Sequence, residues 1–348
     1  MAFIRNCWYP AAFSSAVGEG PLRRTVLGEN IVLFRGEGGA IAALDDLCPH
    51  RMAPLSLGRV RGGGIECGYH GMTFDGRGAC VRIPGQDTIP SRARVRSYAV
   101  AERLGLVWVW MGAAEEAEAS LLVDLAQFDD PAWAVVPGEA LAIGANYLSL
   151  ADNLCDPSHV SFVHTSTLGN AASVGVPVRS RAEGRETVVW RWILDAPAIP
   201  VFAQTGLVQG SVDRWHYYHY HAPCVAIIDF GTAPAGLIGP DGDRDRGLRI
   251  FAVHCITPVD EGHCIDHWFH LRNFGQGDAA LDAALNRSFR TAFDEDKAIL
   301  EAIETEESSR PGFRPVQLAI DAAPNRMRHI VRRLIEAEAA SPALQAAK

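Results

Sequence analysis

The sequence lacks a long apolar run. Its longest, around residues 104–114, is much shorter than the roughly 20 residues that a membrane-spanning helix needs. The N-terminal residues MAFIRNCWYP contain no basic stretch followed by an apolar core, so they do not predict a secretory signal. We therefore expect a cytoplasmic protein without a membrane partner.

Clustered basic residues are missing as well. The formal net charge is −9, and the acidic side chains behind it are scattered rather than gathered in a tail. Nucleic acids and anionic membranes attract clusters of Lys and Arg, so neither is expected as a partner. The sequence also contains no internal repeat and no flavin- or NADH-binding motif.

A chain of 348 residues is long enough for two domains, each with its own core. Residues 1–116 contain short strand-like segments separated by Gly-rich turns, which predicts an all-β domain. An Ala/Glu stretch at 113–120 is the linker candidate. Residues 117–348 group strands between helices, which predicts an α+β domain built on an antiparallel sheet. The expected strands are 187–194, 214–221, 225–230, 248–256 and 264–271, and the expected helices are 278–307 and 325–339.

Two short motifs offer metal ligands. Cys48-Pro49-His50 is followed, after sixteen residues, by Cys67-Gly68-Tyr69-His70. A structural zinc site usually pairs Cys with Cys and His with His, whereas here each motif supplies one of each. A Rieske centre has two Cys on one iron and two His on the other, so we predict a [2Fe–2S] cluster, with a zinc knuckle as the alternative.

The remaining cysteines, six of the eight, have no ligand-like spacing. Without a secretory signal, metal ligation is favoured over a disulfide framework. We therefore expect these six to be small apolar core residues. They are Cys7, Cys80, Cys155, Cys224, Cys255 and Cys264.

A second group of metal-ligand types lies at residues 152–164, DNLCDPSHVSFVH. Asp156 followed by a proline suits a helix N-cap. On an ideal helix, His159 and His164 would diverge by about 140°. They can share a metal only if the helix bends or ends between them, so their spacing alone does not establish ligation.

The long helix predicted at 278–307 offers a carboxylate. On a helical wheel, Asp296 lies at the centre of an apolar stripe, and Asp294 and Glu295 lie outside it. A carboxylate that points into a core costs several kcal/mol unless it is paired or binds a metal. Two His and one carboxylate form the usual ferrous site of oxygenases, and a salt bridge of Asp296 is the alternative. The stripe consists of Leu285, Phe289, Phe293, Ile299, Leu300 and Ile303.

These motifs and the segments GMTFD at 71–75 and IPGQ at 83–86 resemble those of the Rieske non-haem iron oxygenases. The resemblance extends over nearly the whole chain. Within that family the chain resembles vanillate O-demethylase, toluene-sulfonate methyl-monooxygenase and dicamba monooxygenase. The resemblance implies a Rieske domain, a helix-grip catalytic domain, a homotrimer and a separate flavin/iron–sulfur reductase. It also implies ligands for the cluster (Cys48, His50, Cys67 and His70) and for a mononuclear Fe(II) (His159, His164 and Asp296).

The same resemblance gives roles to further residues. Asp156 matches an aspartate between His159 and a cluster histidine of the next subunit. Asn153, Asp229, His254 and Phe289 match substrate-contacting positions. The dicamba enzyme has an asparagine where this chain has Asp229 and a tryptophan where it has Phe289, whereas the toluene-sulfonate relative resembles this chain at Asp229.

We therefore expect O₂-dependent oxidation or O-demethylation of a small aromatic acid, similar to vanillate. A ring-hydroxylating dioxygenase is a rival within the family. A non-catalytic Rieske electron carrier with a ligand-binding domain is a rival from another class of protein, but such a carrier has no need for Asp296 in an apolar stripe. His219 and His221 share one face of a predicted strand; a wall or surface position is favoured there over a third metal site.

Overall fold

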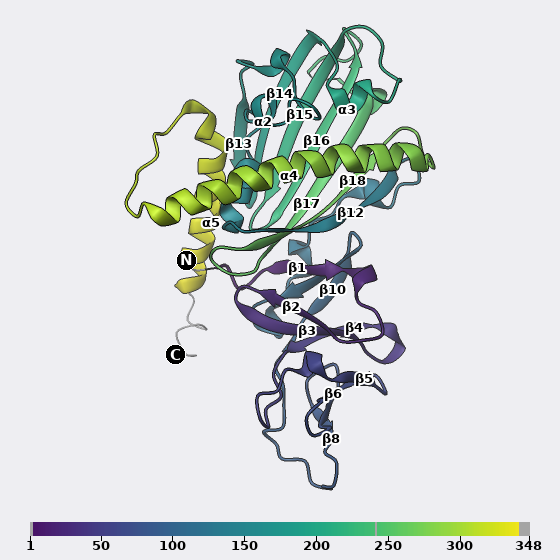
Figure 1. Cartoon of the computed structure of the whole chain (residues 1–348), viewed down its shortest axis with the longest axis vertical. Coiled ribbons are helices and arrows are strands. Elements are labelled where there is room, and N and C mark those ends of the chain that lie inside the picture. The colour runs from purple at the N-terminus through teal and green to yellow at the C-terminus, as the bar shows by residue number, and fades with distance from the viewer. Residues whose placement is uncertain (1–2, 241, 341–348) are drawn as a thin grey trace. The chain divides into compact units, whose positions relative to one another are not determined.

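The computed structural model describes residues 3–240 and 242–340. The chain forms two compact units (Figure 1). One contains the chain up to Asp124 together with Thr257–Asp260; the other contains Leu125–Ile256 and the chain from Glu261 onward. The boundary expected at 116/117 lies among the short 3-10 turns that end the first unit.

The first unit consists of three small β-sheets, as the Gly-rich strand pattern predicted. In the hairpin between β2 and β3, Leu27 and Gly28 have φ of 52° and 79°, the left-handed conformation that a two-residue hairpin turn requires. The sheets are β1 (Trp8–Phe13), β11 (Leu106–Trp110) and β10 (Val100–Arg103); β2 (Leu22–Val26), β3 (Glu29–Arg35), β4 (Ile41–Asp45) and β9 (Ser97–Tyr98); and β5 (Arg59–Arg61), β6 (Gly64–Glu66), β7 (Thr73–Phe74) and β8 (Cys80–Arg82).

The second unit is built on a seven-stranded antiparallel sheet, which confirms the predicted fold class. All five predicted strands are present, and two further strands, β12 and β13, form its edges. In spatial order the strands are β12 (Ala134–Ile143), β18 (Cys264–Arg272), β17 (Leu248–Pro258), β16 (Val225–Pro234), β15 (Val212–His221), β14 (Glu186–Ala196) and β13 (Arg179–Glu183).

Helix α4 (Ala279–Ser309) crosses one face of this sheet (Figure 1). Its N-cap is Asp278, whose carboxylate accepts the N–H groups of Ala280 and Leu281 at 3.0 Å. Phe289 and Phe293 of α4 pack against Trp268 of β18, and Phe289 also packs against Phe230 of β16. This aromatic layer is the core between helix and sheet.

The buried side of α4 is shorter than the wheel predicted. Leu285, Asp296 and Leu300 are buried as expected, whereas Ile299 and Ile303 are 42% and 43% exposed. Ile303 has the same helical phase as Leu285, so phase does not explain its exposure. Leu300 is the last buried residue of α4. Beyond it the contacts are polar, since Glu301 and Glu304 accept the N–H groups of Gly144 and Asn146.

The remaining helices are short or terminal. Helices α1 (Tyr147–Asn153) and α2 (Val160–Val163) lie on either side of Pro157. Helix α3 (Pro200–Ala203) is a single turn, and α5 (Ala322–Ala339) matches the predicted terminal helix. None of the described helices has the length and apolar character needed to cross a membrane.

Candidate metal centres and substrate pocket

The two Cys–His loops of the first unit have the same backbone conformation. In each, the Cys N–H donates to the carbonyl of the fifth residue after it, at 2.9 Å for Cys48 and 2.8 Å for Cys67. The Cys carbonyl accepts the N–H of the fourth residue, at 2.9 and 3.0 Å. The paired residues Met52 and Gly71 both have positive φ, of 59° and 72°. The two loops therefore hold Cys48 and Cys67 alike, whereas the His lies two residues after the Cys in the first loop and three residues after it in the second.

The four side chains meet at the end of this unit with opposite exposures. Cys48 and Cys67 are buried, whereas His50 and His70 are exposed and their rings lie 4.6 Å apart. Burial and the neighbouring Cys67 thiol raise the pKa of Cys48. The backbone N–H groups of His50 and Arg51 lower it, but by less, so the pKa is raised overall. Metal binding supplies the deprotonation that such a thiol needs. Two buried thiolates and two surface imidazoles fit a Rieske cluster.

The second ligand set lies where a helix ends. His159 and His164 flank the single turn α2, as its N-cap and C-cap, and the φ and ψ of His164 (−104° and 41°) are not helical. Because the helix does not continue regularly through both histidines, the two can face the same metal. Asp296 of α4 lies with its Oδ1 3.5 Å from Nε2 of His159 and its Oδ2 3.1 Å from Nε2 of His164. The three ligand atoms lie within 4.8 Å of one another.

Asp296 owes its charge to these neighbours. Burial raises its pKa, but the two imidazoles and the Asn153 amide, which donates to Oδ1 at 2.9 Å, outweigh burial and lower the pKa overall. Burial likewise lowers the pKa of His164, and Asp296 with Glu295 raises it overall. No Arg or Lys pairs with Asp296 in residues 3–240 and 242–340, so the salt-bridge alternative is not supported.

Glu295 corrects a prediction from the helical wheel, which placed it on the surface. Its Oε2 lies 2.8 Å from Nδ1 of His164, because α2 packs beside α4 and covers the edge of the stripe. With Nε2 of His164 facing Asp296, Nδ1 carries the hydrogen that Glu295 accepts. A carboxylate in this position fixes the ring and the tautomer of a metal-binding histidine.

We expect Glu295→Gln to weaken Fe(II) binding at this centre by about 10- to 100-fold. Competition with a ferrous chelator, in protein whose Rieske spectrum is normal, measures this affinity. Asp294→Asn is the matched control, because Asp294 is exposed on the same helix and pairs with Arg290, at 2.9 Å. Equal affinities in the Glu295 variant and wild type would show that His164 needs no such partner.

Asp156 stabilises a turn and not a helix end, which corrects the N-cap prediction. Helix α2 begins at Val160 with His159 as its N-cap, and the Asp156 carboxylate accepts the N–H of Ser158 at 2.7 Å. Its Oδ2 lies 3.8 Å from Nδ1 of His159. Burial raises the pKa of Asp156, but His159 and Ser158 outweigh it and lower the pKa overall. The carboxylate is therefore ionised beside His159, a candidate metal ligand.

A mainly apolar pocket adjoins His159, His164 and Asp296. Asn153, His254 and Phe289, three of the four predicted substrate-contacting residues, line it. The sequence did not single out His216 and Tyr218, which lie on the same face of β15 and also line the pocket. The apolar lining consists of Leu154, Val160, Leu168, Ile228, Phe230, Ala252, Phe289 and Phe293.

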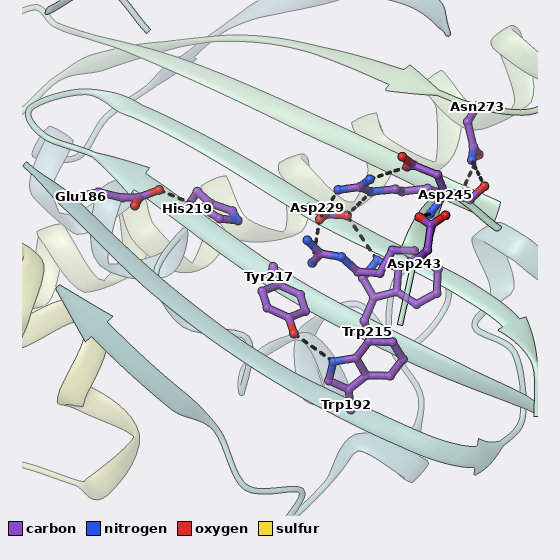
Figure 2. A network of polar contacts seen from close by, with 11 residues as sticks. Glu186, Trp192, Trp215, Tyr217, His219, Asp229, Asp243, Asp245 and Asn273 are labelled. Atoms are coloured by element: carbon purple, nitrogen blue, oxygen red, sulfur yellow. Dashed lines mark hydrogen bonds and ion pairs between the residues drawn. The ribbon is translucent and has the colours of Figure 1, made fainter. Parts of the chain in front are cut away.

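Asp229, the fourth predicted contact, lies on the opposite face of the sheet (Figure 2). Its neighbours in sequence, Ile228 and Phe230, line the pocket, and side chains alternate along a strand. The Asp229 carboxylate is buried between Arg249, at 2.7 and 2.9 Å, and Arg244, at 2.9 Å. The prediction that Asp229 contacts a substrate in this pocket is therefore wrong.

His219 and His221 lie away from the pocket as well. Nδ1 of His219 is 2.9 Å from Oε1 of Glu186, and Nε2 of His221 is 3.7 Å from the same atom (Figure 2 shows the first pair). Both rings are partly exposed. This agrees with the expectation of surface positions on that strand.

Comparison with known proteins identifies both units. Residues 7–99 match the Rieske [2Fe–2S] domain, and residues 143–337 match the vanillate O-demethylase oxygenase C-terminal domain. The iron–sulfur subunit of a toluene-4-sulfonate monooxygenase system from Comamonas testosteroni is 37% identical over 97% of this chain and 98% of its own. This chain belongs to the Rieske non-haem iron oxygenases.

Two further Rieske oxygenases are similar over almost their whole length. A vanillate O-demethylase oxygenase subunit from Pseudomonas sp. strain HR199 is 34% identical, over 97% of this chain and 96% of its own. A crystal structure of dicamba monooxygenase bound to 3,6-dichlorosalicylic acid superposes with a TM-score of 0.91 at 32% identity, over 98% of this chain and 100% of the other. As a Rieske oxygenase, the protein has two cofactors, a Rieske [2Fe–2S] cluster and a mononuclear non-haem iron.

Proposed function

We propose that this Rieske oxygenase oxidises a methyl or methoxy group of a small aromatic acid, with O-demethylation preferred. One observation carries the proposal: a mainly apolar pocket with aromatic and aliphatic walls is lined on one side by His159, His164 and Asp296. Its relatives act, by their names, on toluene-4-sulfonate, vanillate and dicamba. All three substrates carry an anionic group on an aromatic ring.

The ligand assignments belong to the same proposal. Cys48, His50, Cys67 and His70 hold the cluster; His159, His164 and Asp296 hold the mononuclear iron. When bound, the two centres deliver electrons to O₂ and activate it. We expect the electrons to come from NAD(P)H through a separate flavin/iron–sulfur reductase, because the chain shows no motif for either nucleotide.

The side chains of the pocket bind and orient the substrate. Phe289 and Phe293 offer flat apolar surfaces whose rings stack 5.9 Å apart, and Asn153 is held toward Asp296 by its amide hydrogen bond. His254 supplies a polar atom within an otherwise apolar wall. The helix α4 behind this wall excludes water, which strengthens every electrostatic contact in the pocket.

Two rival functions are less well supported. An electron carrier has no use for two histidines and a buried carboxylate gathered beside an apolar pocket. A ring-hydroxylating dioxygenase is disfavoured because the chain matches monooxygenase and demethylase subunits from end to end. A panel of methoxybenzoates, methylbenzenesulfonates and N-methyl compounds, turned over with a surrogate reductase, tests the proposal. Formaldehyde or benzylic alcohol as product supports it, and a ring diol or no turnover of any compound contradicts it.

The two proposed ligand sets, one for a [2Fe–2S] cluster and one for a mononuclear iron, predict the metal content of the protein. We expect about three irons and about two acid-labile sulfides per chain, in protein produced with ample iron and purified without oxygen. Colorimetric iron and sulfide assays on the same sample measure both. Stoichiometric zinc without sulfide would instead indicate a zinc knuckle at the Cys–His loops.

A further inference from the structure

Two of the buried arginines in the described chain have no acidic partner. In residues 3–240 and 242–340 the buried arginines are Arg191, Arg214, Arg249 and Arg272. Oδ2 of Asp229 (labelled in Figure 2) lies 2.7 Å from Nη2 of Arg249, and Arg272 pairs with Asp282. Neither Arg191 nor Arg214 forms an ion pair with a described Asp or Glu, although they are only 3% and 0% exposed.

Arg191 and Arg214 lie together beside a wall residue of the pocket. Arg191 of β14 stands opposite His216 of β15, and Arg214 lies two residues before His216 on the same face of that strand. Both arginines reach Ser173. Nη1 of Arg191 donates to the Ser173 carbonyl at 3.1 Å, and Nη2 of Arg214 donates to its hydroxyl at 3.5 Å. Two positive charges are therefore buried side by side.

The acceptors around the two guanidinium groups are neutral. Arg191 donates to the carbonyl of Pro157 at 2.8 Å and to Nδ1 of His216 at 3.4 Å. Burial and the two arginines lower the pKa of His216, which is therefore neutral. Nη2 of Arg214 also donates to Oδ1 of Asn170, at 3.0 Å. Nε and Nη1 of Arg214 are buried and have no acceptor among the described residues.

Arg214 keeps its charge at neutral pH. Burial, and then the neighbouring Arg191, lower the pKa of Arg214 to about 10, and no carboxylate raises it. Burial also lowers the pKa of Arg191, and Tyr218 and Asp156 raise it by less. A buried charge without a counter-ion is strongly unfavourable. Water would satisfy the free donors of Arg214 but would leave the charge uncompensated, whereas an anion does both.

The free donors indicate the shape of this anion. A carboxylate binds a guanidinium through two parallel N–H groups, and either such pair includes Nη2, which Asn170 and Ser173 already occupy. A spherical ion has no such requirement. Because Arg214 has no exposed surface, its counter-ion is small and comes from solvent, not from a side chain of another molecule.

We propose that Arg214, in the field of Arg191, binds one small spherical anion such as chloride. The two arginines contact both ends of the segment 157–173, which carries the two candidate histidine ligands. The anion would therefore help to hold this segment against the sheet. This inference goes beyond the proposed function and does not depend on it.

Thermal unfolding of holoprotein prepared without chloride tests the proposal. Chloride is titrated against gluconate, a bulky anion, at constant ionic strength and heating rate, so that screening of surface charges does not change. An ion that binds only the folded protein raises the unfolding midpoint with the logarithm of its concentration. Above the dissociation constant, we expect a rise of about 3–5 °C for each tenfold increase in chloride.

Three variants separate this site from general salt effects. Arg214→Met should remove the dependence on chloride. Asn170→Asp places a carboxylate where Arg214 now meets an amide oxygen, and should also remove the dependence while both arginines remain. Arg249→Met is the matched control, because it removes a buried arginine beside Asp229 on the other face of the sheet; it should lower the midpoint and keep the dependence. If Arg214→Met does not accumulate, Asn170→Asp must show the loss.

Crystals of the holoprotein grown in bromide locate the ion directly. We expect an anomalous peak within hydrogen-bond reach of Nε or Nη1 of Arg214. The inference is overturned if chloride stabilises the protein no more than gluconate does, if Arg214→Met keeps the dependence, if Arg249→Met loses it, or if bromide binds only elsewhere.

Discussion

Asp296→Ala is expected to abolish product formation while leaving the optical and EPR signals of the Rieske cluster unchanged. The substitution removes one of the three proposed ligands. It leaves the buried His164 and the partly buried His159 without the carboxylate that lies 3.1 and 3.5 Å from them. The cluster loops share no ligand with this centre and belong to the other unit. Iron should fall from about three to about two per chain, with sulfide constant.

Asp294→Ala is the matched control for this experiment. Asp294 is exposed, two residues away on the same helix, and forms an i,i+4 pair with Arg290. Its loss should change the free energy of unfolding by no more than ~0.5 kcal/mol and leave turnover intact. Loss of the mononuclear iron in the Asp294 variant, with retention in the Asp296 variant, would show that the assigned ligand is wrong.

Asp156→Asn is expected to keep both metal centres and to slow electron delivery between them greatly. Asn can accept the Ser158 N–H as Asp does, so the free energy of unfolding should change by well under 1 kcal/mol. The ionised carboxylate beside Nδ1 of His159 is lost. A carboxylate can accept hydrogen bonds from two imidazoles at once and fix both tautomers, which an amide cannot do in the same way.

Stopped-flow reoxidation of the chemically reduced cluster, with substrate and O₂ present, measures this step. Iron content and chemical reduction of the cluster should be normal in the variant, and reoxidation should be slow. The expectation assumes the homotrimer of the family, in which a cluster histidine of a neighbouring subunit approaches Asp156; light scattering reports that state. Wild-type reoxidation in a trimeric variant would reduce Asp156 to a turn-stabilising residue.

Much of the chemistry could be predicted because it depends on local spacing. One Cys and one His in each of two loops distinguish a Rieske centre from a zinc knuckle without any knowledge of the fold. The phase of Asp296 on a regular helix follows from 3.6 residues per turn, and the structure shows it buried. The alternating side chains of residues 214–221 also predicted the strand β15 correctly, although not which of its faces meets the pocket.

The remaining site features depend on contacts between segments far apart in the sequence. Glu295 lies outside the apolar stripe of its own helix and gains its role only because α2 packs beside it. Asp229 was predicted to contact substrate because it matches a substrate-contacting position of a relative. A strand places successive side chains on opposite faces, however, and the side chain of Asp229 points toward Arg244 and Arg249. Nδ1 of His254 lies 2.7 Å from Oδ2 of Asp266, on the neighbouring strand. By itself the sequence determined the ligand types and their local phase, and only tertiary packing decided their partners, because pairing between strands and helices is set by the global register and not by spacing along the chain.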